Sequence, residues 1–193
     1  MLKNIMIRKV AKVLVITLVI VFIGFSVNFL INAIDKWLYP LKYKELIIEQ
    51  ADLYGLDRAL VFATIKVESS FDKNAKSAKS AIGLMQITES TGKFIASMQG
   101  LENYDLLDEK TNVKFGCYYL RYLFNKFHVI ETVVCAYNAG EGNVSKWLKS
   151  SENSDDQITL KSIPFKETEE YLKKIVKTFE KYKKLYGNLL DKR

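Results

Sequence analysis

The sequence contains little histidine, cysteine, proline or glycine, and each scarcity excludes a class of protein. One histidine among 193 residues argues against a His-based zinc site, which usually needs two or three nitrogen or sulfur ligands. Two cysteines are too few for a disulfide-dense scaffold, and two prolines with nine glycines exclude collagen-like and proline-rich chains. Any Ser-His-Asp triad would depend on His128 alone. An enzyme of this composition is therefore expected to use carboxylates, tyrosines and amides.

Acidic residues are absent before Asp35, which concentrates the positive charge of the chain at its start. The formal net charge is +7. Four of these charges come from Lys3, Arg8, Lys9 and Lys12. The remaining +3 is spread over residues 35–193 with no clustered basic stripe. A weak positive field favours anionic polymers without selecting among them, and no motif for reading bases is present. We therefore expect no nucleic-acid partner.

An uncharged apolar run, residues 13–34, follows this basic flank. A helix needs roughly 20 mostly apolar residues to cross the core of a bilayer, so the run is long enough for a transmembrane anchor. The positive-inside rule places residues 1–12 in the cytoplasm and residues 35–193 outside it. Trp37 and Tyr39 follow where interfacial aromatics are common. The sequence thus predicts a single-pass cell-membrane protein with an extracytoplasmic domain.

A cleaved signal peptide is the main alternative for this run. It would have a shorter apolar core and small residues before the cut, and Ile31-Asn32-Ala33 matches such a site poorly. A buried core helix of this length is a weaker third interpretation. We favour the uncleaved anchor, and both export interpretations place residues 35–193 outside the cytoplasm.

Residues 35–193 show helical spacing of apolar residues without a strand-like alternation, which predicts one all-α domain. A chain of this length buries about 70% of its unfolded surface, which is enough for a core. Gly55 is expected to end a helix over 43–54, and Asp57 to cap the next one. Asp108 is expected to cap another helix. Its apolar stripe comprises Val113, Gly116, Cys117, Leu120, Phe124 and Phe127.

Shorter elements are expected in the last third of the chain. A helix over 131–138 should end at Gly140, and Asn143 should cap a helix over 144–148. Residues 151–157 are polar and are expected to form a loop. A final helix begins near Pro164, with Tyr171, Ile175, Thr178, Tyr182 and Tyr186 at helical spacing.

Glu68 occupies a position where a surface carboxylate is not expected. It continues the apolar stripe of Val61 and Ile65, and residues three and four apart share one face of a helix. Burial disfavours the charged carboxylate and raises its pKa, which gives a general acid able to protonate a glycosidic oxygen. The alternative is a Glu at a helix end that turns to solvent or pairs with a lysine.

Four short blocks follow one another around this carboxylate. They are Glu68-Ser69-Ser70-Phe71, Gly83-Leu84-Met85-Gln86-Ile87, Ala136-Tyr137-Asn138-Ala139-Gly140, and Pro164-Phe165-Lys166-Glu167-Thr168 with Tyr171. The set resembles the SLT-type lytic murein transglycosylases, which have a lysozyme-like fold, and the resemblance extends over about 43–186. The sequence departs from the family at Glu169 and at Ser80-Ala81-Ile82, which is expected to alter the rim of the cleft.

The resemblance implies one catalytic residue, Glu68, surrounded by substrate-binding residues. These are Ser77, Met85, Gln86, Tyr137, Asn138 and Tyr171. Structural alternatives exist for several of them. Met85 is by default a flexible core residue, the two tyrosines can be core aromatics with a satisfied hydroxyl, and Asn138 can terminate a helix.

The implied function is a lytic transglycosylase, which cleaves the bond between N-acetylmuramic acid and N-acetylglucosamine and leaves a 1,6-anhydro sugar. Glu68 would act as both acid and base, with no metal or cofactor and with peptidoglycan glycan strands as partner. We expect no second catalytic carboxylate in the four blocks. A hydrolytic muramidase and an inactive, membrane-tethered wall-binding module are the alternatives. The sequence identifies no protein partner.

Overall fold

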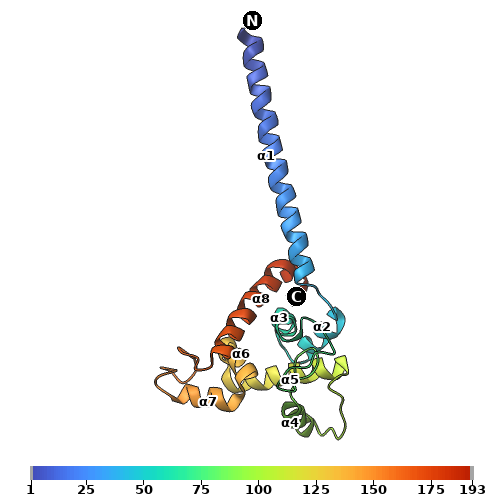
Figure 1. Ribbon diagram of the computed structural model, residues 1–193, viewed down its shortest axis with the longest axis vertical. Helices are drawn as coiled ribbons and strands as arrows, with labels where there is room; N and C mark the ends of the chain where they lie inside the picture. The colour runs from blue at the N-terminus through green and yellow to red at the C-terminus, as the bar shows by residue number, and fades with distance from the viewer. Residues whose placement is uncertain (1, 192–193) are drawn as a thin grey trace. The chain divides into compact units, whose positions relative to one another are not determined.

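The computed structural model describes the backbone of residues 2–191 and the side chains of residue 12 and residues 14–191. Within this part of the chain the secondary structure consists of eight helices and two isolated antiparallel bridges, Lys76–Ile82 and Ile82–Ile87 (Figure 1). The chain divides into two compact units, Met1–Pro40 and Leu41–Arg193. The predicted all-α class is confirmed.

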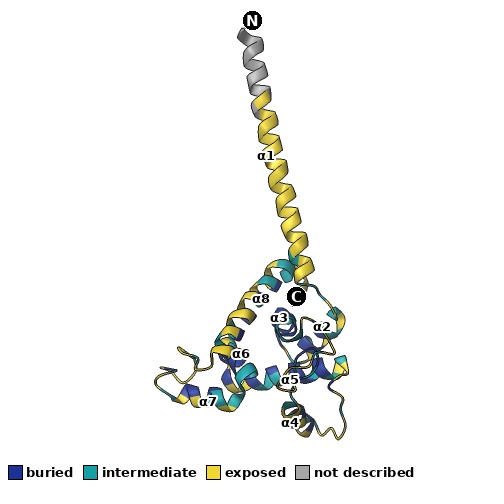
Figure 2. Cartoon of the chain, viewed as in Figure 1, coloured by how far each residue is buried: buried dark blue, intermediate teal, exposed yellow. Residues whose placement is uncertain are grey.

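The first unit is the single helix α1, Leu2–Leu38. Its segment Leu14–Leu38 contains an 18-residue stretch with a mean hydropathy of 2.7, none of which is buried within the protein, and Figure 2 colours most of the segment as exposed. By length and composition this segment is able to cross a membrane. The predicted apolar run 13–34 lies on this helix. Of the predicted basic flank 1–12, Met1 and the side chains of residues 2–11 lie outside the described residues.

The second unit contains the remaining helices. They are α2 (Lys44–Leu53), α3 (Arg58–Ser69), α4 (Glu89–Gln99), α5 (Glu109–Phe127), α6 (Ile130–Ala139), α7 (Glu141–Lys149) and α8 (Lys166–Leu190). The long helix α8 packs against α3 and α6, and α5 packs against α2, α4 and α6. Tyr171, Ile175, Thr178 and Tyr182 form the buried face of α8 at the predicted helical spacing. The buried faces of α3, α5 and α6 complete the core (Figure 2).

Several helix boundaries form where the sequence predicts them. Gly55 follows α2 with a φ of 60°, a left-handed conformation that glycine adopts without strain. The Asp57 carboxylate caps α3 by accepting a 2.8 Å hydrogen bond from the backbone N–H of Ala59. Asp108 caps α5 in the same way, accepting a 2.7 Å bond from the N–H of Thr111. These caps fix where α3 and α5 enter the core.

Two helices differ from the prediction. Sequence analysis predicts no helix over α4, whose N-cap Thr88 accepts a 3.2 Å hydrogen bond from the N–H of Thr91. Helix α7 begins at Glu141 and not after Asn143, so the predicted Asn143 cap is wrong. Gly140, with φ 85°, ends α6 and starts α7 directly, and the Asn143 side chain donates back to the carbonyl of Ala139 at 2.8 Å.

Candidate active site

Glu68 lies in the last turn of α3, at a point where the chain reverses direction. Ser70 and Phe71 follow with φ values of 51° and 66°, a left-handed pair that ends the helix abruptly. The hydroxyl of Ser69 donates a 2.8 Å hydrogen bond to the carbonyl of Leu84, which ties the end of α3 to the loop before α4. The second sequence block is thereby held beside Glu68.

Burial raises the pKa of Glu68 from 4.5 to about 7, although a hydrogen bond from Tyr171 acts in the opposite direction. The Tyr171 hydroxyl donates to Oε1 of Glu68 at 2.6 Å. Burial and the neighbouring Glu68 carboxylate raise the pKa of Tyr171 well above its usual value, so this phenol stays a donor. The interpretation of Glu68 as a solvated or lysine-paired surface residue is wrong for this structure. Its carboxyl group is instead poised to hold a proton near neutral pH.

One cleft brings most of the expected site residues together. Glu68, Ser77, Gln86, Tyr137 and Asn138 all line it. Its wall is completed by Ala78, Lys79, Ala81, Thr88 and Glu167. The end of α3, the loop before α4, the end of α6 and the start of α8 therefore converge here from four separate stretches of sequence.

The loop residues of the cleft each keep one polar atom available for a ligand. Gln86 has a φ of 49°, and its Nε2 donates to the carbonyls of Ala75 at 3.1 Å and Gly83 at 2.9 Å. Both amide protons are thus used, which leaves Oε1 as an acceptor. The Ser77 hydroxyl accepts from the N–H of Ala81 at 3.0 Å, so its own proton can be donated to a ligand.

Tyr137 and Asn138 are held by contacts that cross between elements. The Tyr137 hydroxyl donates to the carbonyl of Met85 at 2.8 Å, and Oδ1 of Asn138 accepts from the Thr168 hydroxyl at 2.7 Å. The Asn138 Nδ2 amide is left to donate to a ligand. Asn138 does stand one residue before the end of α6, but its side chain bonds to α8 instead of capping its own helix.

Met85 does not line the cleft, which corrects the sequence-based expectation. Its side chain is 0% exposed and fills the space over Gly116 on α5, where an added Cβ would come within 2.7 Å of the Met85 Cβ. The side chain of Asn112 accepts from the N–H of Met85 at 2.8 Å. Met85 therefore holds Tyr137 through its backbone carbonyl, which accepts the Tyr137 hydroxyl. Its own side chain has no exposed surface for a sugar.

Glu167 is a site residue that the sequence analysis did not identify. It lines the same cleft as Glu68 and lies in the fourth block, so the blocks do place a second carboxylate at the site, while the expectation that no second carboxylate is catalytic stays a prediction. Lys79 donates to both of its carboxylate oxygens at 2.8 Å, and the two side chains are 65% and 73% exposed. The available signal was its place in the fourth block, directly before Thr168. Within the described residues, no group of three His, Cys, Asp or Glu side chains could hold a metal ion.

Comparison with known proteins places this geometry in a family. The model of the transglycosylase SLT domain matches residues 45–160. The soluble lytic murein transglycosylase of Escherichia coli K12 is 31% identical over 158 residues, which cover 78% of this chain and 24% of that protein. The membrane-bound lytic murein transglycosylase C of Photorhabdus laumondii is 34% identical over 146 residues, covering 69% and 40%.

Solved structures of lytic transglycosylases are also similar to this chain. The 70 kDa soluble lytic transglycosylase of Escherichia coli has a TM-score of 0.68 at 30% identity, covering 77% of this chain and 25% of that one. An inactive Glu→Gln mutant of lytic transglycosylase Slt from Pseudomonas aeruginosa has a TM-score of 0.67 at 28% identity, covering 76% and 25%. The chain spans about a quarter of the length of these soluble relatives. The family model matches most of the second unit, and the solved lytic transglycosylases share its fold. The chain therefore belongs to the transglycosylase SLT domain family.

Proposed function

We propose that this protein is a lytic transglycosylase, which cleaves the β-1,4 bond between N-acetylmuramic acid and N-acetylglucosamine in peptidoglycan. The observation that carries the proposal is Glu68, a largely buried carboxylic acid with a pKa of about 7 in the cleft of an SLT domain. Relatives named lytic murein transglycosylases support the same substrate class. Because these relatives are longer, the activity is a proposal about this chain.

The proposed reaction uses Glu68 twice. The protonated carboxyl gives its proton to the glycosidic oxygen as the bond from that oxygen to C1 of the muramoyl ring breaks. The N-acetyl oxygen of the substrate supports the oxocarbenium-like centre. The Glu68 carboxylate then takes the proton from the C6 hydroxyl, whose oxygen attacks C1 and closes the 1,6-anhydro ring. The carboxyl group is restored, and no water is consumed.

The cleft supplies groups that can hold the sugar for this ring closure. The free Oε1 of Gln86 accepts, and the Ser77 hydroxyl and the Asn138 amide donate, in line with the hydrogen bonds that each already makes. Tyr171 stabilises the carboxylate form of Glu68 that appears after the first proton transfer. An intramolecular hydroxyl in attack geometry reaches an effective molarity of roughly 10⁵ M or more, far above that of water.

Hydrolysis is the second candidate, and Glu167 is the observation that favours it. Most glycosidases use two carboxylates, and an inverting hydrolase would need Glu167 as the base that activates water. The ion pair with Lys79 occupies both Glu167 oxygens at 2.8 Å, which supports a role in the cleft wall. An inactive wall-binding module is less well supported, since it would have no need of Glu68, a half-buried acid with a raised pKa.

We also propose that α1 anchors the protein in the cell membrane, with the N-terminus in the cytoplasm and the SLT domain outside. The apolar segment Leu14–Leu38 and the relatives named membrane-bound support this topology. Protease added to intact, wall-stripped cells is expected to remove the domain, and full protection of it would contradict the topology. The mass of the mature protein distinguishes an anchor from a cleaved signal sequence, which passes the same length and hydropathy test.

The catalytic role of Glu68 is tested by Glu68→Gln. Gln keeps the shape and accepts the bond from Tyr171, but it cannot transfer the proton. General acid–base groups contribute about 10²–10⁴-fold, and because one group here makes both transfers the loss is expected at the upper end. The measurement is release of muropeptides from purified peptidoglycan by the folded variant. Activity like that of the wild type would refute the assignment.

A further inference from the structure

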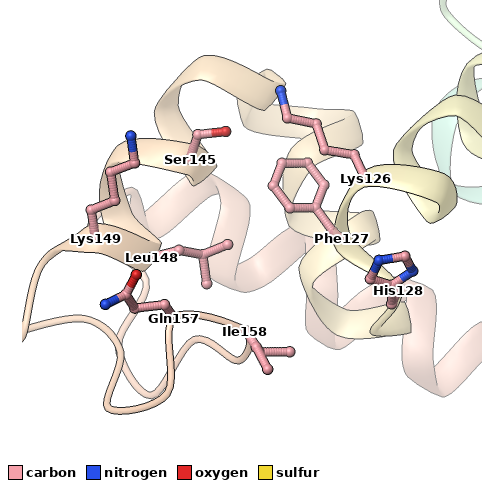
Figure 3. A pocket seen from close by; sticks show the side chains of 8 residues that line it. All are labelled: Lys126, Phe127, His128, Ser145, Leu148, Lys149, Gln157 and Ile158. Carbon is pink, nitrogen blue, oxygen red and sulfur yellow. The ribbon is translucent and has the colours of Figure 1, made fainter.

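A second hollow lies outside the Glu68 cleft and shares none of its lining residues (Figure 3). It is formed by the C-terminal end of α5, by α7 and by the loop before α8. Its wall comprises Lys126, Phe127, His128, Ser145, Leu148, Lys149, Gln157 and Ile158. The reaction proposed for Glu68 uses none of these side chains.

The hollow combines an apolar floor with a basic rim. In Figure 3 the side chains of Phe127, Leu148 and Ile158 surround its centre, and Ile158 is 52% exposed there. Lys126 and Lys149 stand at the edge of the same hollow (Figure 3). Among the described residues Lys149 has no ion-pair partner, whereas Lys126 donates to Glu141 at 2.7 Å. This arrangement is complementary to a small anion that carries short apolar groups.

One face of α5 runs from beside the wall of the Glu68 cleft to the edge of the hollow. Tyr119, Tyr122 and Lys126 lie at helical spacing on it, and the ring of Tyr119 stands 5.6 Å from that of Tyr137 in the cleft wall. Tyr119 stacks on Tyr122 with centroids 6.1 Å apart. The Tyr122 hydroxyl and Lys126 both donate to Oε2 of Glu141.

The distance covered along this face is short. The seven residue-to-residue steps from Tyr119 to Lys126 rise about 10 Å along the helix. An extended peptide covers that length with roughly three residues at 3.3–3.6 Å each. A peptide of this length that starts beside Tyr119 therefore reaches Lys126 at the edge of the hollow.

We propose that this hollow binds the peptide stem of the glycan strand whose sugars occupy the Glu68 cleft, an inference that rests on the function proposed above. A stem is a short peptide with free carboxylates and alanine methyl groups. Its carboxylate pairs with Lys149, and its methyl groups contact Phe127, Leu148 and Ile158. The Ser145 hydroxyl and the Gln157 amide bond to its backbone.

The first test measures binding of a synthetic stem tetrapeptide ending in D-alanine to the full-length protein in detergent micelles. Lys149→Glu is expected to weaken binding about fivefold or more, because it replaces an attractive charge at the rim with a repulsive one. Ile158→Asp should weaken it as well. Lys177→Glu, an equal charge change at an exposed position of α8 outside both hollows, is the control and should bind normally. Undiminished binding by Lys149→Glu and Ile158→Asp would overturn the inference.

The second test separates the stem from the sugars. Cleavage is compared on intact peptidoglycan and on strands freed of stems by an amidase. Lys149→Glu should lower kcat/KM about fivefold on the intact substrate and leave the stem-free substrate unaffected. An equal loss on both substrates would overturn the proposal. The wild-type protein could bind the tetrapeptide through Lys149 and still release no anhydro product. That result would refute the proposed reaction and leave the proposed binding site supported.

Discussion

The Tyr171 hydroxyl donates a 2.6 Å hydrogen bond to Oε1 of Glu68, joining α8 to the end of α3 across 103 residues of sequence. This contact limits how far burial raises the pKa of Glu68, because a donor to the carboxylate favours its charged form. The resulting pKa of about 7 suits a group that must give a proton and then take one back. The packing of α3 against α8 thus sets the chemistry of the cleft.

The pH dependence of cleavage should report this contact. Glu68 must be protonated to act as the acid, so kcat/KM is expected to fall as pH rises above about 7. Tyr171→Phe removes the donor that favours the carboxylate, so the falling limb should move to higher pH. The pH profiles of both proteins are the measurement. If the falling limb of Tyr171→Phe stays at the same pH as in the wild type, or moves to lower pH, the Tyr171 hydroxyl does not lower the pKa of Glu68.

The raised pKa also predicts a pH-dependent effect on stability. Between the ordinary pKa of 4.5 and about 7, the folded protein holds the Glu68 proton more tightly than the unfolded chain does. The free energy of unfolding of the wild type therefore falls as pH rises through this window. Glu68→Gln lacks this term, so it should match the wild type below pH 4.5 and exceed it above pH 7. The difference there should be on the order of 3 kcal/mol.

Denaturant titrations at several pH values check this second prediction. An excess stability of Glu68→Gln that is constant across the whole range would show that the carboxyl group is not desolvated in the folded protein. The same titrations confirm that the variant is folded, which the activity assay requires.

Gly116 should be intolerant of a side chain. A Cβ there would lie 2.7 Å from the Cβ of Met85, whose carbonyl accepts the Tyr137 hydroxyl. Gly116→Ala is expected to cost about 1–3 kcal/mol of stability through overpacking, and to lower kcat/KM by displacing Tyr137. Gly142→Ala is the matched control in α7, where an added Cβ meets nothing within 4 Å. Equal effects of the two substitutions on thermal stability would contradict the packing argument.

Elements with strong local signals could be predicted from the sequence. Gly55, Asp57 and Asp108 each control a helix end through their own backbone or side chain, and the structure confirms all three. Helix α4 was missed because its apolar positions are few and its cap, Thr88, is a weak signal by itself. The predicted start of α7 is wrong because Gly140 is both the C-cap of α6 and the N-cap of α7. A search for a separate cap for each helix does not anticipate this.

The site residues likewise divide into those with a local sequence signal and those whose position depends on other elements. The apolar stripe, a local pattern, indicates that Glu68 faces inward, and the resemblance of the four blocks to a family implies its catalytic role. Met85 was misplaced because its burial depends on Gly116, a neighbour on another helix. Glu167 was missed because its place in the cleft depends on how α8 begins beside the loop that carries Lys79. Long-range packing places both side chains and leaves no periodicity in the sequence, although the position of Glu167 in the fourth block is a signal that the sequence does contain.

Glu167→Gln distinguishes a wall residue from a catalytic base. Since Lys79 holds both oxygens of Glu167, we expect the variant to form the same anhydro product as the wild type. Chromatography of its digestion products checks this. A variant whose products shift from reducing-end sugars to anhydro sugars would identify Glu167 as the base of a hydrolytic reaction.

The most direct test of the proposed function is the mass of the muropeptides that the wild-type protein releases from purified peptidoglycan. Capture of C1 by the muramoyl C6 hydroxyl gives a product lighter by one water than the product of hydrolysis. With Glu68 serving as acid and then as base, the released ends should carry 1,6-anhydro-N-acetylmuramic acid, and Glu68→Gln should release almost none. A digest whose cut ends are all reducing muramic acid would show that the protein is a muramidase and contradict the proposed mechanism.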